Sequence, residues 1–155
     1  MNEQQKKERY SRVIEQLEDL FKATDDPICR MATISSLLNH KLGHFFWVGF
    51  YRLIDGELLV GPYQGTLACQ KLQRDTGVCW ASVNRRQAVV VPDVEKFPGH
   101  IACDSRSKSE IVIPVYDKGG NVVAVLDADS DQLDTYDDID RENLQTIVDM
   151  IYQKR

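Results

Sequence analysis

The residues with the clearest chemical potential lie in the polar stretch GHIACDSRSKSEIVIP, at positions 99–114. It places Cys103 close to His100 and ahead of Glu110, which opens an apolar run. A thiolate in a polar loop can be reached by a substrate and stabilised by nearby donors, whereas a buried thiol is inert. The stretch therefore suggests a reactive nucleophile facing a carboxylate pocket, beside two simpler interpretations: a buried structural thiol or a metal ligand.

The other cysteines leave several alternatives open. A zinc site would combine Cys69, Cys79, Cys103 and His100, but their spacings match no familiar paired-ligand pattern. A cysteine–histidine pair, as in thiol hydrolases, is a second alternative without a supporting signature. His100 itself is most simply a loop residue that bonds the backbone. Cys79, in the first turn of a predicted helix, would gain thiolate stabilisation from the helix dipole, or serve as a small packing residue.

Three acidic residues stand where apolar ones are expected. In NVVAVLDADS, Asp127 and Asp129 share one strand face with Val123 and Val125, so two acids continue an apolar stripe. Glu110 similarly opens EIVIPV, and a hairpin at 118–120 could bring it near both aspartates. The acids are therefore either solvated strand ends or the mouth of a polar pocket.

Converging carboxyl groups would have a distinct chemistry. They cannot all ionise without cost, because neighbouring negative charge and desolvation raise at least one pKa. One proton could then be donated to a substrate oxygen, while the remaining anions attract an ammonium group. The strand FWVGFY supplies a possible wall, since Trp47, Gly49 and Tyr51 alternate to one side and Gly49 leaves space for a ligand. Aromatic residues at this spacing are also typical of a core.

The composition narrows the class of protein. A chain of 155 residues fits one domain, and its net charge of −5, with scattered basic residues, argues against nucleic acid or an anionic membrane as partner. Its apolar runs are far shorter than the roughly 20 residues of a membrane span. The N-terminus resembles neither a signal nor a transit peptide, so we expect a cytoplasmic protein whose cysteines stay as thiols unless its own chemistry oxidises them.

The elements that must position these residues follow from periodicity. Apolar residues at helical spacing predict N-terminal helices over about 3–40, with the first over 3–22, and a C-terminal helix over about 137–153. Between them, about 44–130, we expect two hairpins turning at Asp55-Gly56 and at 118–120, a short helix and strand between the hairpins, and a long loop over 92–109. This order predicts an α+β fold with a largely antiparallel sheet flanked by helices.

Several motifs together resemble a known family. WVGFYRL, LVGPYQG with ACQ, GVC, PDVEKFPGHIACDSRSKSEIVIP and VLDADS occur in order over roughly residues 45–145. They resemble the free methionine-(R)-sulfoxide reductases, which are built on a GAF fold. The resemblance implies a single GAF-like domain over 1–155 that reduces free methionine-(R)-sulfoxide with no cofactor and no metal.

The resemblance also implies roles for individual residues. Cys103 matches the catalytic cysteine, Cys69 the resolving cysteine and Cys79 an auxiliary or alternative resolving cysteine. In the implied cycle, Cys103 becomes a sulfenic acid and then forms a disulfide with Cys69, which a thioredoxin-type reductant reopens. The substrate-pocket residues of the family match positions already singled out here: Trp47, Glu110, Asp127 and Asp129. Tyr51 joins them from the strand alternation alone.

The sequence departs from the family pattern at three places. Trp80 follows GVC where glycine is usual, so it could alter the surroundings of Cys79 or the pocket rim. Leu67 replaces a proline before AC, and QRDTGVC stands where a glycine-rich approach is common. The alternative to an enzyme is a GAF domain that binds or senses a small molecule without turnover. A homodimer is also possible, because GAF domains often pair through helices.

Overall fold

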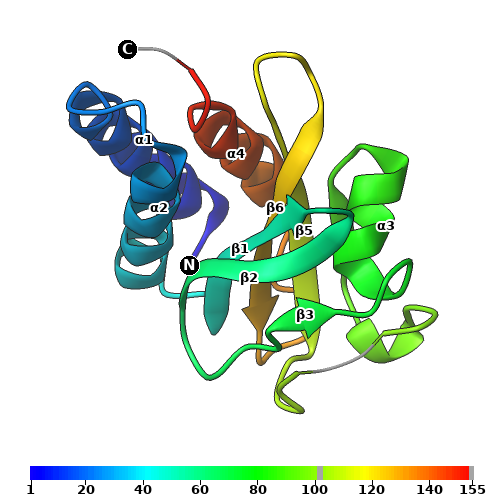
Figure 1. Ribbon diagram of the computed structural model, residues 1–155. Coiled ribbons are helices and arrows are strands. Elements are labelled where there is room, and N and C mark those ends of the chain that lie inside the picture. The colour runs from blue at the N-terminus through cyan, green and yellow to red at the C-terminus, as the bar shows by residue number, and fades with distance from the viewer. Residues whose placement is uncertain (101–102, 154–155) are drawn as a thin grey trace.

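A six-stranded antiparallel sheet forms the centre of the molecule (Figure 1). The computed structural model describes residues 1–100 and 103–153. The strand order is β3-β2-β1-β6-β5-β4, so the first long hairpin and the last lie side by side through β1 and β6. The strands are β1 (Trp47–Ile54), β2 (Glu57–Gln64), β3 (Lys71–Leu72), β4 (Val89–Val91), β5 (Ser109–Tyr116) and β6 (Val122–Ser130).

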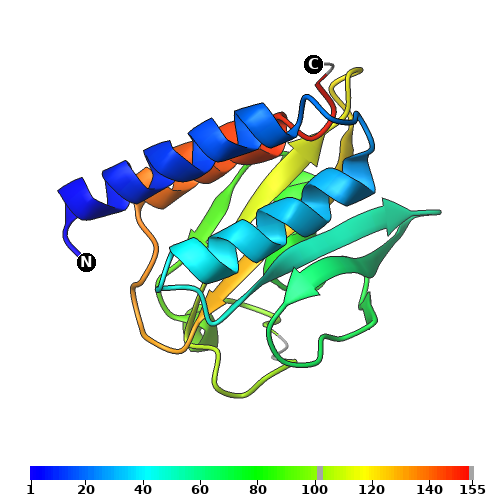
Figure 2. The ribbon, with the colours of Figure 1, turned by 90° about the vertical axis from the view of Figure 1, so that its left-hand side faces the viewer.

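Helices cover the two faces of the sheet unequally. α1 (Glu3–Leu20), α2 (Pro27–Lys41) and α4 (Asp138–Asp149) lie on one face (Figure 2), and α3 (Gly77–Arg85) lies on the other. Local sequence explains their starts: Asn2 and Asp137 form capping boxes, and Asp26 caps α2 ahead of Pro27. In the part of the chain described, no helix is long and apolar enough to cross a membrane.

The period-two alternation of the strands separates two apolar cores. In β6, Ala124, Leu126 and Ala128 face the three-helix layer, whereas Val125 faces α3 together with Trp47 of β1. Asp127 and Asp129 follow Val125 on the α3 side and line a cavity there. The second face therefore changes from apolar to acidic along a single strand.

The α+β prediction with an antiparallel sheet is confirmed, and several details differ. The first helix ends at Leu20 rather than at residue 22, and the last ends at Asp149. The strand β3 was not predicted, because two residues carry no readable pattern, and a 3-10 turn (Val94–Lys96) interrupts the predicted loop. Val123 was predicted on the acidic face, but a register shift beside it turns it toward the three-helix core.

A buried carboxylate ties α1 to α4. Asp140 is fully buried and accepts hydrogen bonds from Lys6 Nζ (2.7 Å), Tyr10 Oη (2.6 Å) and its capping partner Asp137 N (2.9 Å). His44 Nε2 lies 2.8 Å from Oδ1 of Asp140. Burial alone would raise the pKa of Asp140, but the hydrogen bonds of His44, Lys6 and Tyr10 outweigh burial and lower it.

We expect Asp140→Asn to lower the free energy of unfolding at pH 7 by about 3 kcal/mol, because Lys6 loses its buried counter-charge. Urea denaturation measures this. The matched control is Asp138→Asn, two residues earlier on the same helix, whose side chain is 85% exposed. Its loss should stay below about 1 kcal/mol. Equal stability of the two variants would contradict the structural role of Asp140.

The same measurement at acidic pH tests the lowered pKa. The unfolded chain has an ordinary aspartate pKa of about 3.9, so the contribution of Asp140 is complete above that pH. It is lost as the pH falls through the lower folded-state pKa, because the folded protein must then take up a proton. The stability difference between wild type and Asp140→Asn should therefore shrink below about pH 4.

Candidate active site

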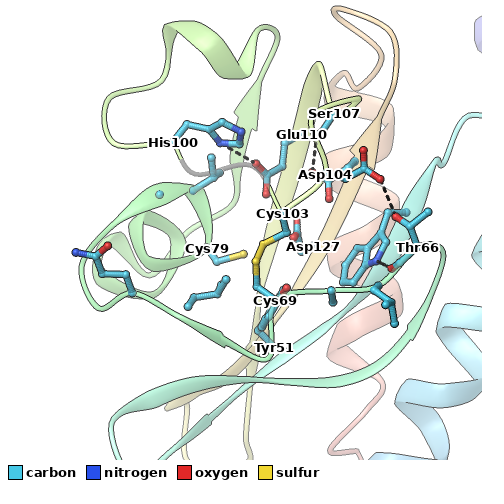
Figure 3. Close-up of a pocket in the computed structure, with 18 of the residues that line it drawn as sticks. Tyr51, Thr66, Cys69, Cys79, His100, Cys103, Asp104, Ser107, Glu110 and Asp127 are labelled. Carbon is cyan, nitrogen blue, oxygen red and sulfur yellow. Dashed lines mark hydrogen bonds and ion pairs between the residues drawn. A yellow bond between two sulfur atoms is a disulfide. The ribbon is translucent and has the colours of Figure 1, made fainter.

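A cavity of about 240 Å³ opens on the sheet face that carries α3 (Figure 3). Its walls come from β1, β5, β6, the start of α3 and two loops that carry cysteines. All eight site residues singled out from the sequence line this cavity: Trp47, Tyr51, Cys69, Cys79, Cys103, Glu110, Asp127 and Asp129. Their proximity is an observation, and their individual roles remain predictions.

Strand register brings the three acids together. Glu110 of β5 pairs with Asp129 of β6, and Asp129 also pairs with Trp47 of β1 on its other side. Asp127 points to the same face two residues earlier. Paired side chains on adjacent antiparallel strands have Cβ atoms about 5 Å apart. The three carboxyl groups therefore come together because β5 pairs with β6, as the sequence analysis considered. The pairing of β1 with the other edge of β6 adds Trp47 beside Asp129.

Burial gives these acids unusual protonation behaviour. Glu110 is 5% and Asp127 7% exposed. Burial first, and then the charges of Asp127 and Asp129, raise the pKa of Glu110 well above its usual value. Burial also raises the pKa of Asp127 despite hydrogen bonding with Glu110 and Cys79, and burial together with Asp127 raises that of Asp129. These directions favour retention of at least one proton in the cluster at neutral pH.

Cys79 lies in the first turn of α3 and faces the acids. It is 5% exposed, and burial, followed by the charges of Asp127 and Glu110, raises its pKa. The expected stabilisation of its thiolate by the helix dipole is therefore outweighed, and the thiol stays neutral at neutral pH. Trp80 is buried in the same apolar cluster without lining the cavity, so it packs behind Cys79 rather than forming the pocket rim.

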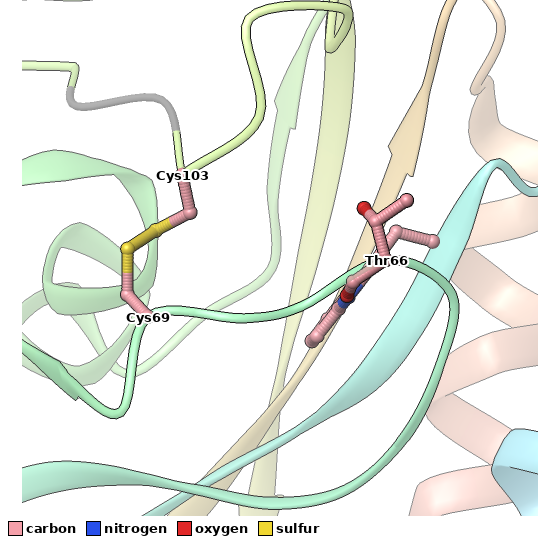
Figure 4. Close-up of a disulfide and its surroundings, with 4 residues drawn as sticks. Thr66, Cys69 and Cys103 are labelled. Carbon is pink, nitrogen blue, oxygen red and sulfur yellow. A yellow bond between two sulfur atoms is a disulfide. The ribbon is translucent and has the colours of Figure 1, made fainter.

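A disulfide joins Cys69 to Cys103 at the cavity (Figure 4), with Cα atoms 5.7 Å apart. These residues are 34 positions apart in the chain and belong to different loops. Cys103 is exposed and Cys69 is half-buried. The pair is the one that the family resemblance implied. It also rules out the four-ligand zinc arrangement in this state, because two of the proposed ligand sulfurs are bonded to each other.

Among residues 1–100 and 103–153, the geometry brings one set of possible metal ligands together. Ligand atoms of Cys79, Glu110 and Asp127 all lie within 4.8 Å of one another. A divalent cation could bind there through one thiolate and two carboxylate oxygens, once all three groups had lost their protons. This set differs from the set considered on sequence spacing, since the acids replace Cys69, Cys103 and His100.

His100 makes a backbone contact within its loop and also lies beside the acids. Its Nδ1 is 3.9 Å from Glu110 Oε1, and its side chain is mostly buried. Burial lowers the pKa of the imidazole, which favours the neutral ring at neutral pH. The backbone N–H of His100 donates to Phe97 O at 3.2 Å. The loop therefore places a polar but uncharged ring against Glu110.

The aromatic wall is real, but the space predicted at Gly49 is filled. Trp47 stacks on Tyr63 at 5.3 Å between ring centroids and on Tyr51 at 6.1 Å. A Cβ on Gly49 would collide with Cβ of Tyr63, so glycine permits this tight packing between β1 and β2. Burial, followed by the charge of Asp127, raises the pKa of Tyr51, which therefore remains a neutral phenol.

Sequence reasoning missed the polar residues that fix the loops. Ser107 Oγ donates to Asp129 Oδ1 at 3.3 Å, and Thr66 Oγ1 donates to Asp104 Oδ2 at 2.9 Å. Trp47 Nε1 donates to the carbonyl oxygen of Thr66 at 3.0 Å. Ser107 lies in the stretch already quoted, where a polar residue before the strand was a weak signal. The Thr66–Asp104 contact spans 38 positions and has no local signal.

Comparisons with known proteins agree with this arrangement. The family model of the GAF domain matches residues 32–151. GAF domain-containing protein A of Dictyostelium discoideum is 44% identical over 94% of this chain and 92% of its own length. Free methionine-R-sulfoxide reductase of Escherichia coli is 40% identical over 78% of this chain and 73% of its own.

A solved structure extends the likeness to three dimensions. The reduced form of fRMsr from Staphylococcus aureus superposes with a TM-score of 0.87 at 41% identity, covering 92% of each chain. The likeness therefore includes the sheet, the helices and the segments that carry the cavity. The chain belongs to the GAF-domain proteins and, within them, to the free methionine-R-sulfoxide reductase family of enzymes.

Proposed function

We propose that this protein, acting as one GAF domain over residues 1–155, reduces free L-methionine-(R)-sulfoxide to L-methionine by thiol chemistry. The observation that carries the proposal is the Cys69–Cys103 disulfide at a cavity lined by three carboxyl groups. A disulfide between an exposed and a half-buried cysteine is the expected product of a sulfenic acid that a second thiol has resolved.

The cavity suits a small zwitterionic substrate. Its carboxylates attract a free ammonium group, and the stacked rings of Trp47 and Tyr51 offer an apolar wall to the thioether chain. A residue within a peptide has no free amino group, so these acids would lie without a counter-charge. This argument favours the free amino acid over a protein-bound methionine sulfoxide.

The reaction begins in the reduced enzyme. The Cys103 thiolate attacks the sulfoxide sulfur, while a protonated carboxyl group donates its proton to the sulfoxide oxygen. Methionine leaves as the oxygen transfers to Cys103 as a sulfenic acid. The Cys69 thiol then attacks the Cys103 sulfur, water leaves and the disulfide forms. Two electrons have passed from the cysteine pair to the substrate.

Glu110 is the best candidate for the proton donor. It faces Asp127 and Asp129 on the neighbouring strand, and the charges of both aspartates add to burial in raising the pKa of Glu110. Hydrogen bonds from Glu110 and Cys79 oppose the rise for Asp127, so the proton favours Glu110 over Asp127. A neutral carboxylic acid at this position can donate to a departing oxygen at neutral pH.

Recycling needs an external reductant, for which we propose a dithiol protein of the thioredoxin type in the cytoplasm. The reductant reopens the disulfide by thiol exchange.

Pairing of two copies is a further proposal, and light scattering of the purified protein tests it. A sensor GAF domain is the alternative function, and tight ligand binding without any loss of sulfoxide would favour it over an enzyme.

We expect Cys103→Ser to abolish methionine formation, because it removes the attacking sulfur. Pre-reduced Cys69→Ser should release about one methionine per enzyme when no reductant is added. When thioredoxin is then supplied, this variant should fail to recycle. Chromatography of methionine after incubation with each sulfoxide epimer measures both, and only the R epimer should be consumed. The matched control is Cys29→Ser, an exposed free cysteine, which should behave as wild type. Multiple turnovers by Cys103→Ser would contradict the assignment.

We expect Glu110→Gln to lower kcat/KM by about 10²- to 10⁴-fold, the usual contribution of a general acid. The acid must be protonated to act, so wild-type kcat/KM should fall as the pH rises through its raised pKa. That alkaline limb should be absent from the residual activity of Glu110→Gln, as a pH–rate profile would reveal. Glu95→Gln, an exposed glutamate, is the control. A wild-type profile in Glu110→Gln would show that another group donates the proton.

A further inference from the structure

Leu67 is the most exposed large apolar side chain in the part of the chain described, at 86%. It lies two residues before Cys69, so it stands next to the disulfide in sequence. Isolated exposed leucines are common on protein surfaces and need no special reason. Leu67 differs from such isolated leucines because it lies beside the Cys69–Cys103 disulfide, on a segment that other residues hold in place.

The segment that carries Leu67 is held on both sides. The carbonyl oxygen of Thr66 accepts a hydrogen bond from Trp47 Nε1, and the Thr66 hydroxyl donates to Asp104 (Figure 3). Cys69 is fixed by its disulfide to Cys103 (Figure 4). The Leu67 side chain is therefore presented to solvent from an anchored backbone, at the edge of the cavity that it also lines.

Two partly buried apolar residues share the edge of the cavity with Leu67. Phe46, Leu67 and Ala68 all line the cavity, and we call these three residues the apolar rim. The guanidinium of Arg106 lies 4.7 Å from the centroid of the Phe46 ring. Asp104 orients that guanidinium through contacts of 3.1 Å to Nε and 2.8 Å to NH2. The rim is thus an apolar surface with one fixed cation at its border.

Reopening the disulfide requires electrons from outside this chain. Cys29 lies at the start of α2, in the three-helix layer, and Cys79 is buried in the first turn of α3. Attack by either single thiol would only exchange one disulfide for another, so neither can restore both cysteines. The incoming thiolate must approach along the bond that breaks, so a protein reductant has to cover the surface next to the sulfurs. The exposure of Cys103 leaves that approach open.

We propose that the apolar rim is the docking surface for a protein that carries a vicinal dithiol, and this inference rests on the function proposed above. The first thiolate of the partner attacks one sulfur of Cys69–Cys103 and displaces the other as a thiolate. The second thiol of the partner attacks its neighbour in the mixed disulfide and releases the second cysteine. The partner is oxidised to its disulfide by two electrons, and both cysteines of this protein are reduced. Covering Leu67 adds apolar burial only when a partner is large enough to reach it.

The test compares a protein reductant with a small one. Leu67→Ser and Leu67→Glu are assayed with free methionine-(R)-sulfoxide, once with thioredoxin, its reductase and NADPH, and once with dithiothreitol. We expect the KM for thioredoxin to rise by about tenfold in Leu67→Ser and further in Leu67→Glu. Because Leu67 also lines the cavity, the rate with dithiothreitol and the KM for the sulfoxide are measured for each variant, and the KM for thioredoxin should rise well beyond any change in either. Leu20→Ser, at the end of α1 on the opposite sheet face and 49% exposed, is the matched control.

The outcomes separate this inference from the proposed function. Wild-type KM for thioredoxin in both Leu67 variants would overturn the docking surface, and so would an equal loss with both reductants, which would mean that Leu67 only positions the Cys69 loop. Turnover by wild type with dithiothreitol but never with thioredoxin would overturn the proposed class of partner. Absence of turnover with dithiothreitol in wild type would instead reject the enzymatic function itself.

Discussion

The partial removal from water of three neighbouring carboxyl groups is the constraint on which the rest of the site depends. Glu110, Asp127 and Asp129 come from two neighbouring strands and line one cavity, where removal from water penalises each charge. Their folded arrangement is stable only if protons or an incoming cation neutralise part of that charge. A proton held in this way can be given to an oxygen, and an ammonium group can take its place electrostatically. In the proposed function, substrate binding and acid catalysis both follow from this electrostatic imbalance.

The opposite face of the sheet shows how partners decide the behaviour of a buried acid. Asp140 is as deeply buried as Glu110, yet its pKa is lowered, because Lys6, Tyr10 and His44 surround it with donors. Glu110 has acids for neighbours, and its pKa is raised. The same kind of side chain thus stabilises the helical layer in one place and stores a proton in the other.

The fold places the acids and the cysteine pair on different kinds of segment. The acids stand on paired strands, whose register holds them in place, whereas Cys69 and Cys103 stand on loops. Hydrogen bonds from Trp47 and Thr66 still keep the cysteine loops beside the cavity. Strand pairing therefore positions the acids, whereas contacts between loops position the cysteines. Leu67 is exposed on the same loop as Cys69 and belongs to the surface proposed to dock the reductant.

Local patterns in the sequence determined the helices, both long hairpins and the placement of acids on a strand face, because periodicity and turn residues act over a few positions. Motif resemblance added the family and the cysteine pair. Tertiary structure alone decided that β1 pairs with β6, which sets Trp47 against Asp129, and that Cys79 is buried against Asp127 and Glu110. It also decided the two-residue strand β3, the bulge at Val123 and the Thr66–Asp104 contact. These depend on distant segments meeting, and protonation depends on the burial that such meetings create.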